Sequence, residues 1–346
     1  MRALVLKPGP PCALELIKDY PVPQLGDGEV LVRQSSTSVN PVDYKIAAGA
    51  FKPKFDKVLG GDVSGIVEES KAAEFKKGDR VIALTFGYHW DYDQYGSYAD
   101  VTVSKKEWLA KVTEKFPIEI GGGVPLASLT ALQALLSGGM PKPGARMLIQ
   151  GGAGGVGHFA IQLAKAHFKA YVVATGGSSN QALMKELGAD ETVDYTKEDF
   201  SAKYKDQPFD VIMDSVGGDV EKRCYTVLAP GGTYAHIFNE KTNLQNADVA
   251  KDTWTEGRKY TRTLVQPNGE QLSLIAGLVE EGKVKLVVDK EYTLEQFRDA
   301  YKYAEDQHRE VQVKWGVDDC QSPFLTAALH ACACFGQPPL VQSHLE

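Results

Sequence analysis

Apolar and polar residues alternate in short stretches over the first part of the chain, as in "EVLVRQ", "SGIVEE" and "DRVIAL". Turn sequences such as "GDG" and "KKGD" separate these stretches, and no long amphipathic helical pattern appears before residue 117. Alternation with period two between turn signals is typical of half-buried β-strands. The pattern therefore predicts an all-β domain of about 115 residues at the start of the chain.

The pattern changes at "RMLIQ" (146–150), a continuous apolar run of the kind expected in a buried parallel strand. One helical stripe follows it, formed by Val156, Phe159, Ala160, Leu163 and Ala164. Further strand-like and helix-like stretches then alternate up to "TYAHIF" (233–238). This alternation predicts an α/β domain built on a doubly wound parallel sheet of the Rossmann type.

Two amphipathic helices are predicted after this sheet, at 272–282 and 293–307, the second with Thr293 and Gln296 in capping-box spacing. "VQVKW" (311–315) closes the compact part. Residues 317–346 contain apolar clumps without a sustained period. They are interpreted as a disordered extension or as an alternative or misread terminus.

A Gly-x-Gly-x-x-Gly pattern, Gly152, Gly154 and Gly157, joins the predicted strand at 146–150 to the helix that follows it. Glycines let the backbone approach a ligand closely, and a helix N-terminus offers free N–H groups to phosphate. A flexible glycine-rich turn is the alternative interpretation, but the strand and helix on either side favour a dinucleotide site. Its expected backbone contacts are Gly152, Ala153, Gly154, Gly155, Val156 and Gly157.

The residues after the next predicted strand bear on the choice of nucleotide. An NAD site usually has an acid about 20 residues after the first glycine. Here the stretch holds Thr175, Ser178, Ser179 and Asn180, and no acid. Hydroxyl and amide groups can hydrogen-bond the 2′-phosphate of NADPH, although the same residues could simply cap the next helix. We therefore expect NADPH to be the cofactor.

Composition excludes several classes of function. The chain has 346 residues, enough for two domains, and a formal net charge of −7 provides no basic surface for nucleic acid or an anionic membrane. No apolar run is long enough to cross a bilayer, and the first residues do not resemble a signal peptide. We therefore expect a cytoplasmic protein that acts on a small molecule.

The five cysteines form no Cys-x-x-Cys pair, and an odd count argues against a disulfide framework. Only "HACAC" (330–334) groups soft ligands, in a spacing that matches no familiar zinc module. No metal site is expected.

The order of these parts resembles the medium-chain dehydrogenase/reductase superfamily over residues 1–316. Several segments resemble its zinc-independent quinone oxidoreductase and alkenal (enone) reductase branch: "SVNPVDYKIAAG", "LGGDVSGIV", "GSYADV", "VPLASLTALQAL", "GGAGGVG" and "FDVIMDSVGG". The resemblance implies a GroES-like, β-barrel-type substrate domain over 1–120 and 268–316, and a Rossmann NADP-binding domain over 121–267. It also implies a homodimer, through an edge strand within "RKYTRTLVQP" (258–267).

Zinc-dependent members of the superfamily carry Cys near position 40 and Gly-His-Glu near position 61, where this chain has Asn40, Gly61 and Asp62. Without these ligands a zinc-activated alcohol oxidation is not expected. The resemblance instead implies metal-free hydride transfer from NADPH to a conjugated C=C–C=O group or a quinone. An enoyl-thioester reductase, or a nucleotide-binding structural or regulatory protein with little turnover, is the alternative.

By the same resemblance Asn40 lies beside the nicotinamide, and Tyr44 or Lys45 donates a proton to the developing enolate oxygen. A rim-packing aromatic and a solvated surface charge are the alternative roles of these two side chains. Asp43 is expected to cap the turn that follows. The aromatic stretch 86–96, which contains His89, is either a pocket wall or a surface loop. The remaining cofactor contacts that the resemblance implies are Thr130 at the nicotinamide ribose, Tyr195 at the adenosine phosphate, and the backbone at Val216 and Phe238.

Overall fold

The computed structural model describes residues 1–9, 13–49, 55–85, 96–237, 255–307 and 311–314. Within them the strands form three sheets, of three, six and seven strands. The cysteines at 12, 320, 332 and 334, the aromatic stretch 86–95, Phe238 and the tail 317–346 lie outside the described residues.

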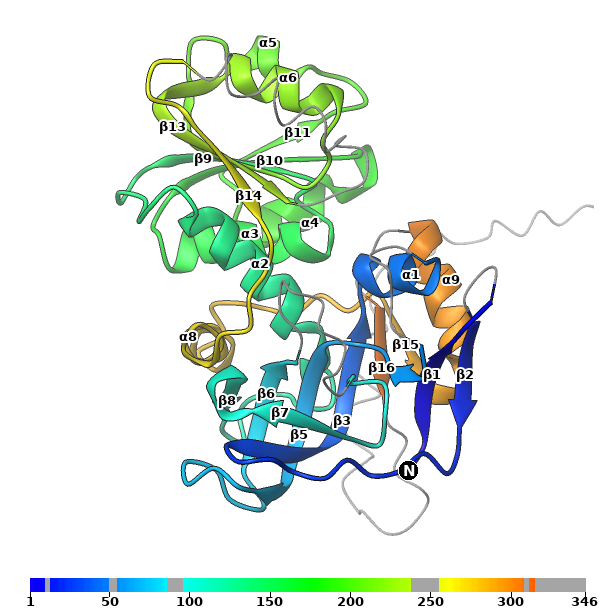
Figure 1. Ribbon diagram of the computed structural model, residues 1–346. Helices are drawn as coiled ribbons and strands as arrows, with labels where there is room; N and C mark the ends of the chain where they lie inside the picture. Colours follow the sequence, from blue (N-terminus) through cyan, green and yellow to red (C-terminus); the bar gives the residue numbers. More distant parts are fainter. Residues whose placement is uncertain (10–12, 50–54, 86–95, 238–254, 308–310, 315–346) are drawn as a thin grey trace, which may run out of the picture. The chain divides into compact units, whose positions relative to one another are not determined.

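The seven-stranded sheet has the order β15-β16-β3-β5-β6-β8, with β7 also paired to β3 (Figure 1). Neighbours in it are antiparallel except for β15 and β16, which run parallel. Its strands are β3 (Glu29–Val39), β5 (Asp62–Ser70), β6 (Arg80–Leu84), β7 (Val101–Lys105), β8 (Leu109–Lys111), β15 (Lys290–Thr293) and β16 (Val311–Lys314). A small sheet, β2-β1-β4, consists of β1 (Ala3–Lys7), β2 (Ala13–Ile17) and β4 (Lys57–Val58).

The expectation of an all-β start is wrong in one detail, because helix α1 (Pro41–Ala47) interrupts the strands. Seven residues are too few to show a repeating helical stripe, so the periodicity of the sequence did not reveal it. Pro41 at the first helical position and Asn40 before it are ordinary helix-start signals. This short helix carries the predicted donors Tyr44 and Lys45, and Asn40 lies directly before it.

The six-stranded sheet is entirely parallel, and its order β11-β10-β9-β12-β13-β14 is the 3-2-1-4-5-6 order of a Rossmann fold. The strands are β9 (Arg146–Gln150), β10 (Tyr171–Gly176), β11 (Glu191–Asp194), β12 (Phe209–Asp214), β13 (Leu228–Ile237) and β14 (Lys259–Thr263). The predicted doubly wound sheet is therefore confirmed.

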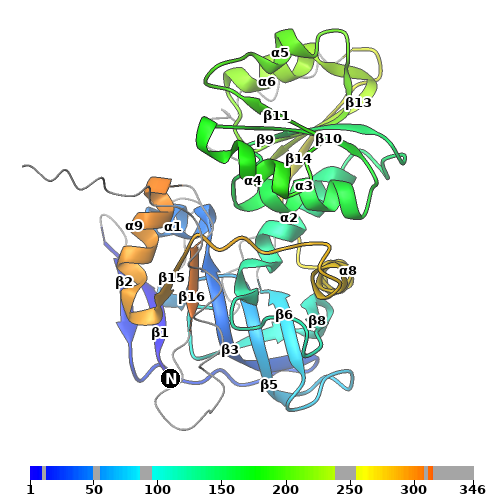
Figure 2. The same cartoon turned by 180° about the vertical axis from the view of Figure 1, so that it is seen from behind.

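Helices cover both faces of this sheet. Figures 1 and 2 show α5 (Phe200–Lys203) and α6 (Asp219–Thr226) on one face, and α3 (Gly155–Ala166) and α4 (Gln181–Glu186) on the other. Residues of β9 alternate accordingly, since Met147 and Ile149 belong to one buried cluster and Leu148 to another. The strand is buried on both sides, which explains its continuous apolar sequence.

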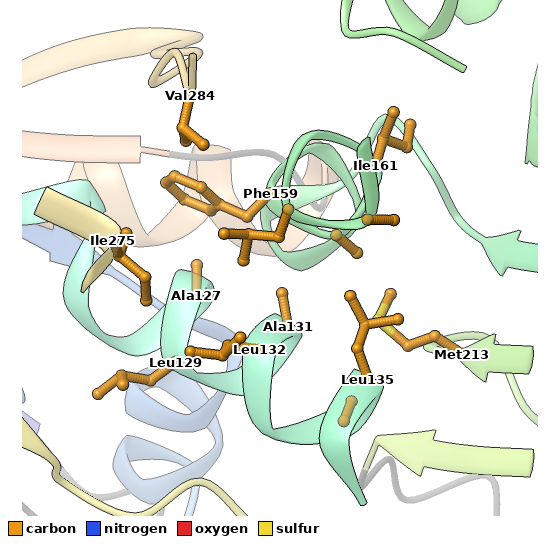
Figure 3. Packing of buried hydrophobic residues seen from close by; sticks show 14 of the residues in the cluster. Ala127, Leu129, Ala131, Leu132, Leu135, Phe159, Ile161, Met213, Ile275 and Val284 are labelled. Atoms are coloured by element: carbon orange, nitrogen blue, oxygen red, sulfur yellow. The ribbon is translucent and has the colours of Figure 1, made fainter. Parts of the chain in front are cut away.

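The largest cluster joins α3 to α2 (Pro125–Leu136) and α8 (Gly269–Glu280). Figure 3 shows Phe159 of α3 lying between α2 and Val284. Of the predicted α3 stripe, all but the half-buried Val156 are fully buried. The burial fixes the start of α3 against the sheet, and with it the glycine turn.

After α8 the chain returns to the seven-stranded sheet. The predicted capping box is present, since the backbone N–H of Thr293 donates to Gln296 Oε1 at 3.0 Å and α9 (Phe297–Gln307) follows. Strand β16 then pairs antiparallel with β3, Val311 opposite Val39.

Candidate functional site

The glycine turn connects β9 to α3 at the carboxyl edge of the parallel sheet, next to the point where the strand order reverses between β9 and β12. Gly151 has φ +71°, a conformation that favours glycine. A Cβ on Gly157 would lie 2.1 Å from the carbonyl oxygen of Gly151, so the turn can close against the helix only if residue 157 is glycine. The first N–H groups of α3 have no partner within the helix, and no acid lies in its first turn. The cradle therefore fits a diphosphate.

A pocket opens beside this turn, lined in part by Gly154, Gly155, His158, Asn180 and Asp289. His158 is 2% exposed, and burial lowers its pKa to about 4, so its imidazole is neutral. Its Nδ1 lies 3.2 Å from the Gly154 carbonyl oxygen, which makes Nδ1 the N–H donor. Nε2 is buried without a hydrogen-bond partner in the described part of the chain, so it is an acceptor for a hydroxyl rather than for a phosphate.

Thr175, the first of the predicted nucleotide contacts after β10, holds the turn itself. Its hydroxyl donates to Gln150 Oε1 at 2.6 Å and accepts from the backbone N–H of Gly151 at 3.3 Å. The side chain is 2% exposed. In this structure Thr175 stabilises the cradle from inside and does not present its hydroxyl at the surface.

The stretch 175–180 contains no acid, but the structure brings one to it from the next strand. Asp194 at the end of β11 pairs with Gly176 at the end of β10. Its carboxylate accepts from Ser178 Oγ, from Thr196 Oγ1 at 2.6 Å, and from Lys197 Nζ at 3.1 Å. The Ser178 hydroxyl first and the Thr196 groups next hold the pKa of Asp194 well below its usual range. Parallel strands end at one edge, so an Asp closing the next strand was the available signal for it.

The other predicted contacts of the nucleotide lie around the same edge. Ser179 is exposed and Asn180 is half-buried before α4. Tyr195 is 63% exposed, and its hydroxyl lies near Gly177. Val216, after β12, is 41% exposed, and its backbone N–H donates to Asp214 Oδ1 at 2.7 Å. The structure thus brings these residues to the carboxyl ends of β10, β11 and β12.

Asn40 lies in a different cluster, which joins β3, β5 and the starts of α1 and α2. It is 3% exposed, and its Nδ2 donates to Asp62 Oδ2 at 2.6 Å and to Ser38 Oγ at 3.1 Å. Its backbone N–H donates to Asp43 Oδ2 at 2.8 Å. Asp43 therefore caps the start of the helix that contains it, α1, and not a turn after it as the sequence suggested.

Asp62 is the residue of this cluster that sequence reasoning missed as a functional group. It is 1% exposed and accepts three hydrogen bonds, from Ser38 Oγ at 2.5 Å, from Asn40 Nδ2, and from the backbone N–H of Leu126 at 2.6 Å. Burial raises the pKa of Asp62 to about 6 against the opposing effect of these donors. Leu126 belongs to the first turn of α2, and its carbonyl oxygen accepts from Thr130 Oγ1 at 2.7 Å.

Asp43 is a second buried carboxyl nearby. Tyr98 donates its hydroxyl to Asp43 Oδ2 at 2.8 Å and lies 3.0 Å from the Ser38 carbonyl oxygen. Burial raises the pKa of Asp43 to about 7, and the donors from Asn40 and Tyr98 limit the shift. Both carboxyls therefore lie in an uncommon environment for an acidic side chain.

Tyr44 and Lys45 follow Asp43 on α1 and are half-buried. The Tyr44 ring packs against the apolar cluster that contains Ile46 and Leu59. Tyr44 and Lys45, the predicted proton donors, therefore lie on the same short helix, four and five residues after its N-cap Asn40.

The residues at positions 40 and 62 do not fit a zinc ion, because the amide nitrogen of Asn40 already occupies Asp62 Oδ2. Within the described ranges no three His, Cys, Asp or Glu side chains group as a metal site. Cys224 is the one cysteine among the described residues; it is buried, and burial raises the pKa of its thiol. Among the described helices none is long and apolar enough to cross a membrane.

Known proteins resemble the chain over most of its length. Residues 26–114 match the alcohol dehydrogenase GroES-like domain, and residues 187–310 match a family described as zinc-binding dehydrogenase. The chloroplast envelope quinone oxidoreductase homolog of Arabidopsis thaliana is 34% identical over 83% of this chain and 89% of its own length. The NADPH-dependent alkenal/one oxidoreductase of the same plant is 31% identical over 85% and 74%.

The solved quinone oxidoreductase of Coxiella burnetii superposes with a TM-score of 0.80, at 30% identity, over 91% of this chain and 99% of that one. Its similarity covers both the seven-stranded and the parallel sheet. Fold, glycine turn and sequence identity agree. The chain belongs to the medium-chain dehydrogenase/reductase superfamily, as an oxidoreductase of its quinone oxidoreductase and alkenal (enone) reductase branch.

Proposed function

We propose that the protein reduces the conjugated C=C bond of an α,β-unsaturated carbonyl, or a quinone, with NADPH as the hydride donor. The observation that carries this proposal is the Asn40–Asp62 hydrogen bond, between two positions where, by the sequence resemblance, zinc-dependent members of the superfamily would have metal ligands. A site without a Lewis acid suits an acceptor that is already polarised by conjugation. The names of the similar plant enzymes point to the same class of substrate.

When bound, NADPH supplies a hydride to the β-carbon of the acceptor. This chain's part is to hold the cofactor and to stabilise the negative charge that develops on the carbonyl oxygen. The cradle that ends at Gly157 would hold the diphosphate, and Tyr44 or Lys45 would donate a proton to the oxygen of the enolate. Tautomerisation then gives the saturated carbonyl. For a quinone, hydride and proton together give the hydroquinone.

A preference for NADPH over NADH belongs to the proposal. Ser178, Ser179 and Asn180 present polar groups where the ribose 2′-phosphate would lie. The charge of Asp194 at this edge is already matched by two hydroxyl donors and by the ammonium of Lys197. Lys197 has a side chain that is 72% exposed, so its ammonium can turn from Asp194 to a phosphate. Tyr195 beside it would pack against the adenosine half.

The test measures NADPH oxidation, with a chelator present, against an enone, a quinone and an enoyl thioester. Tyr44→Phe removes only a hydroxyl, and Lys45→Met removes only a charge. We expect at least one of them to lower kcat roughly a hundredfold with NADPH affinity nearly unchanged. The product from the enone should be the saturated ketone or aldehyde. An allylic alcohol as product, or parental rates in both variants, would contradict the assigned chemistry or the donor role respectively.

A homodimer through β14 completes the proposal. This strand lies at the edge of the parallel sheet as the described residues form it; Lys259 and Arg262 are exposed and Tyr260 and Thr261 half-buried. Such an edge can pair with its copy across a two-fold axis. Sedimentation at micromolar concentration tests the assembly, and a monomer throughout would exclude it.

A further inference from the structure

One buried carboxylate connects the two residues assigned to the nicotinamide. Asp62 Oδ2 accepts from Asn40 Nδ2 at 2.6 Å, and Asp62 Oδ1 accepts from the Leu126 backbone N–H at 2.6 Å. Leu126 in turn accepts from Thr130 Oγ1 at 2.7 Å. Asn40 and Thr130 are thus tied to the same side chain, directly in one case and through the first turn of α2 in the other.

The donors around Asp62 require a carboxylate. Its two oxygens receive a hydroxyl, an amide N–H and a backbone N–H, and each of these groups donates. An amide side chain of the same shape could still accept from Leu126, but its own N–H groups would then point at those of Asn40. The positive end of the α2 helix adds a favourable field for the negative charge.

The location of Asp62 also separates it from the reacting atoms. It is 1% exposed at the start of β5, and the described groups that hydrogen-bond its carboxylate are Ser38, Asn40 and Leu126. Any effect on the reaction must therefore pass through the residues that it holds. Asp62 holds these residues firmly, because hydrogen bonds to a buried carboxylate are stronger than those between neutral groups.

We propose that Asp62 is a positioning residue, whose carboxylate fixes the Asn40 amide and the Thr130 turn of α2 in the geometry that the nicotinamide needs. This role rests on the proposed function, since it takes Asn40 and Thr130 as nicotinamide contacts. In this role the carboxylate of Asp62 positions other residues of the site and does not bind a metal ion.

The test exploits the direction of the Asn40–Asp62 bond. Asp62→Asn turns the pair into two facing amides, whereas Asp62→Glu keeps the carboxylate and the net charge and only lengthens the stem. Asp79→Asn is the matched control, because Asp79 also combines a backbone N–H, that of Lys76, with a side-chain partner, Lys111, and lies before the opposite end of β6 from the residue that pairs with Asp62.

Four quantities are measured for each variant: the melting temperature, the Kd of NADPH, the fluorescence emission of bound NADPH, and kcat with an enone. We expect Asp62→Asn to lower kcat roughly thirtyfold and to shift the emission toward that of free NADPH, with Kd changed less than about threefold. Asp62→Glu, which keeps an acceptor for the same donors, should have a kcat at least about fivefold higher than that of Asp62→Asn. The control should match the parent in all but melting temperature.

Each other outcome has a definite meaning. Parental kcat and emission in Asp62→Asn would overturn the proposal, and so would a folded Asp62→Glu variant that is no faster than Asp62→Asn. If Asp62→Asn does not fold, a folded Asp62→Glu variant with shifted emission and lowered kcat supports the proposal; parental values in that variant, or failure of both variants to fold, would mean that Asp62 serves the fold alone and that the proposal is wrong. If the parent protein itself neither oxidises NADPH nor alters its fluorescence, the proposed function fails instead.

Discussion

Replacing Gly157 by alanine should test whether the glycine turn is held by close packing. The new Cβ would lie 2.1 Å from the Gly151 carbonyl oxygen and 2.8 Å from Gly152 Cα. Both are backbone atoms that cannot rotate away, so α3 and the turn must separate by about 1.3 Å, from 2.1 to 3.4 Å, to reach ordinary contact. Overpacking of this kind costs about 3 kcal/mol at its upper range. Alanine returns about 1 kcal/mol through its higher helix propensity.

The net loss in the free energy of unfolding is therefore about 2 kcal/mol, or a melting temperature lower by about 4 to 8 °C. NADPH affinity should fall at least about tenfold, because the N–H groups that would face the proposed cofactor's diphosphate move with the helix. Thermal melting without cofactor and a fluorescence titration with NADPH measure the two effects.

Gly154→Ala is the matched control for stability. Its Cβ would lie 3.3 Å from the same Gly151 oxygen, and its φ of −78° suits alanine. We expect it to change the free energy of unfolding by less than about 0.5 kcal/mol. If Gly157→Ala has the same melting temperature as the control and binds NADPH with the affinity of the parent, the packing argument for the turn is refuted.

Three further predictions follow from the site. Lys197→Ala should weaken NADPH binding severalfold and leave NADH binding nearly unchanged in parallel titrations. Equal losses of affinity for both nucleotides would show that Lys197 does not contact the 2′-phosphate. The pKa of Asp43, raised by burial to about 7 from 3.8, means that the folded state binds the proton more tightly than the unfolded state. The free energy of unfolding should therefore fall as pH rises from about 4 to 7, and Asp43→Asn should flatten part of that slope in urea titrations, with Asp62 supplying the rest. Activity should survive exhaustive chelation, and elemental analysis of the purified protein should find no stoichiometric zinc; zinc-dependent recovery of activity would contradict this.

The parallel sheet could be predicted from sequence because its signals are local. Strand β9 is a continuous apolar run, α3 has its own apolar stripe, and Gly152, Gly154 and Gly157 mark the turn between them. The Thr293–Gln296 cap is likewise local. Such features need only neighbouring residues, so periodicity and spacing identify them.

The parts that sequence reasoning missed depend on partners distant in the chain. Asp194 reaches Ser178 because β11 lies beside β10, and Asp62 reaches Leu126 because β5 begins beside the start of α2. In both cases the sequence showed an acid and no indication of its partner. The sequence showed that positions 40 and 62 do not carry zinc ligands, but it did not show that Asn40 and Asp62 hydrogen-bond to each other.

The pairing of β16 with β3 sets the order in which the protein can mature. Among the described residues no strand of another sheet lies between β9 and β14, so this sheet can form while later residues are still being synthesised. Ser38 and Val39, by contrast, find their strand partners Gln312 and Val311 only when almost the entire described chain is present. Because contacts so distant in sequence form slowly, the end of β3 that leads into Asn40 receives its strand partner late, although the rest of β3 already pairs with β5 and β7. A newly made chain would bind nucleotide before it could turn over substrate.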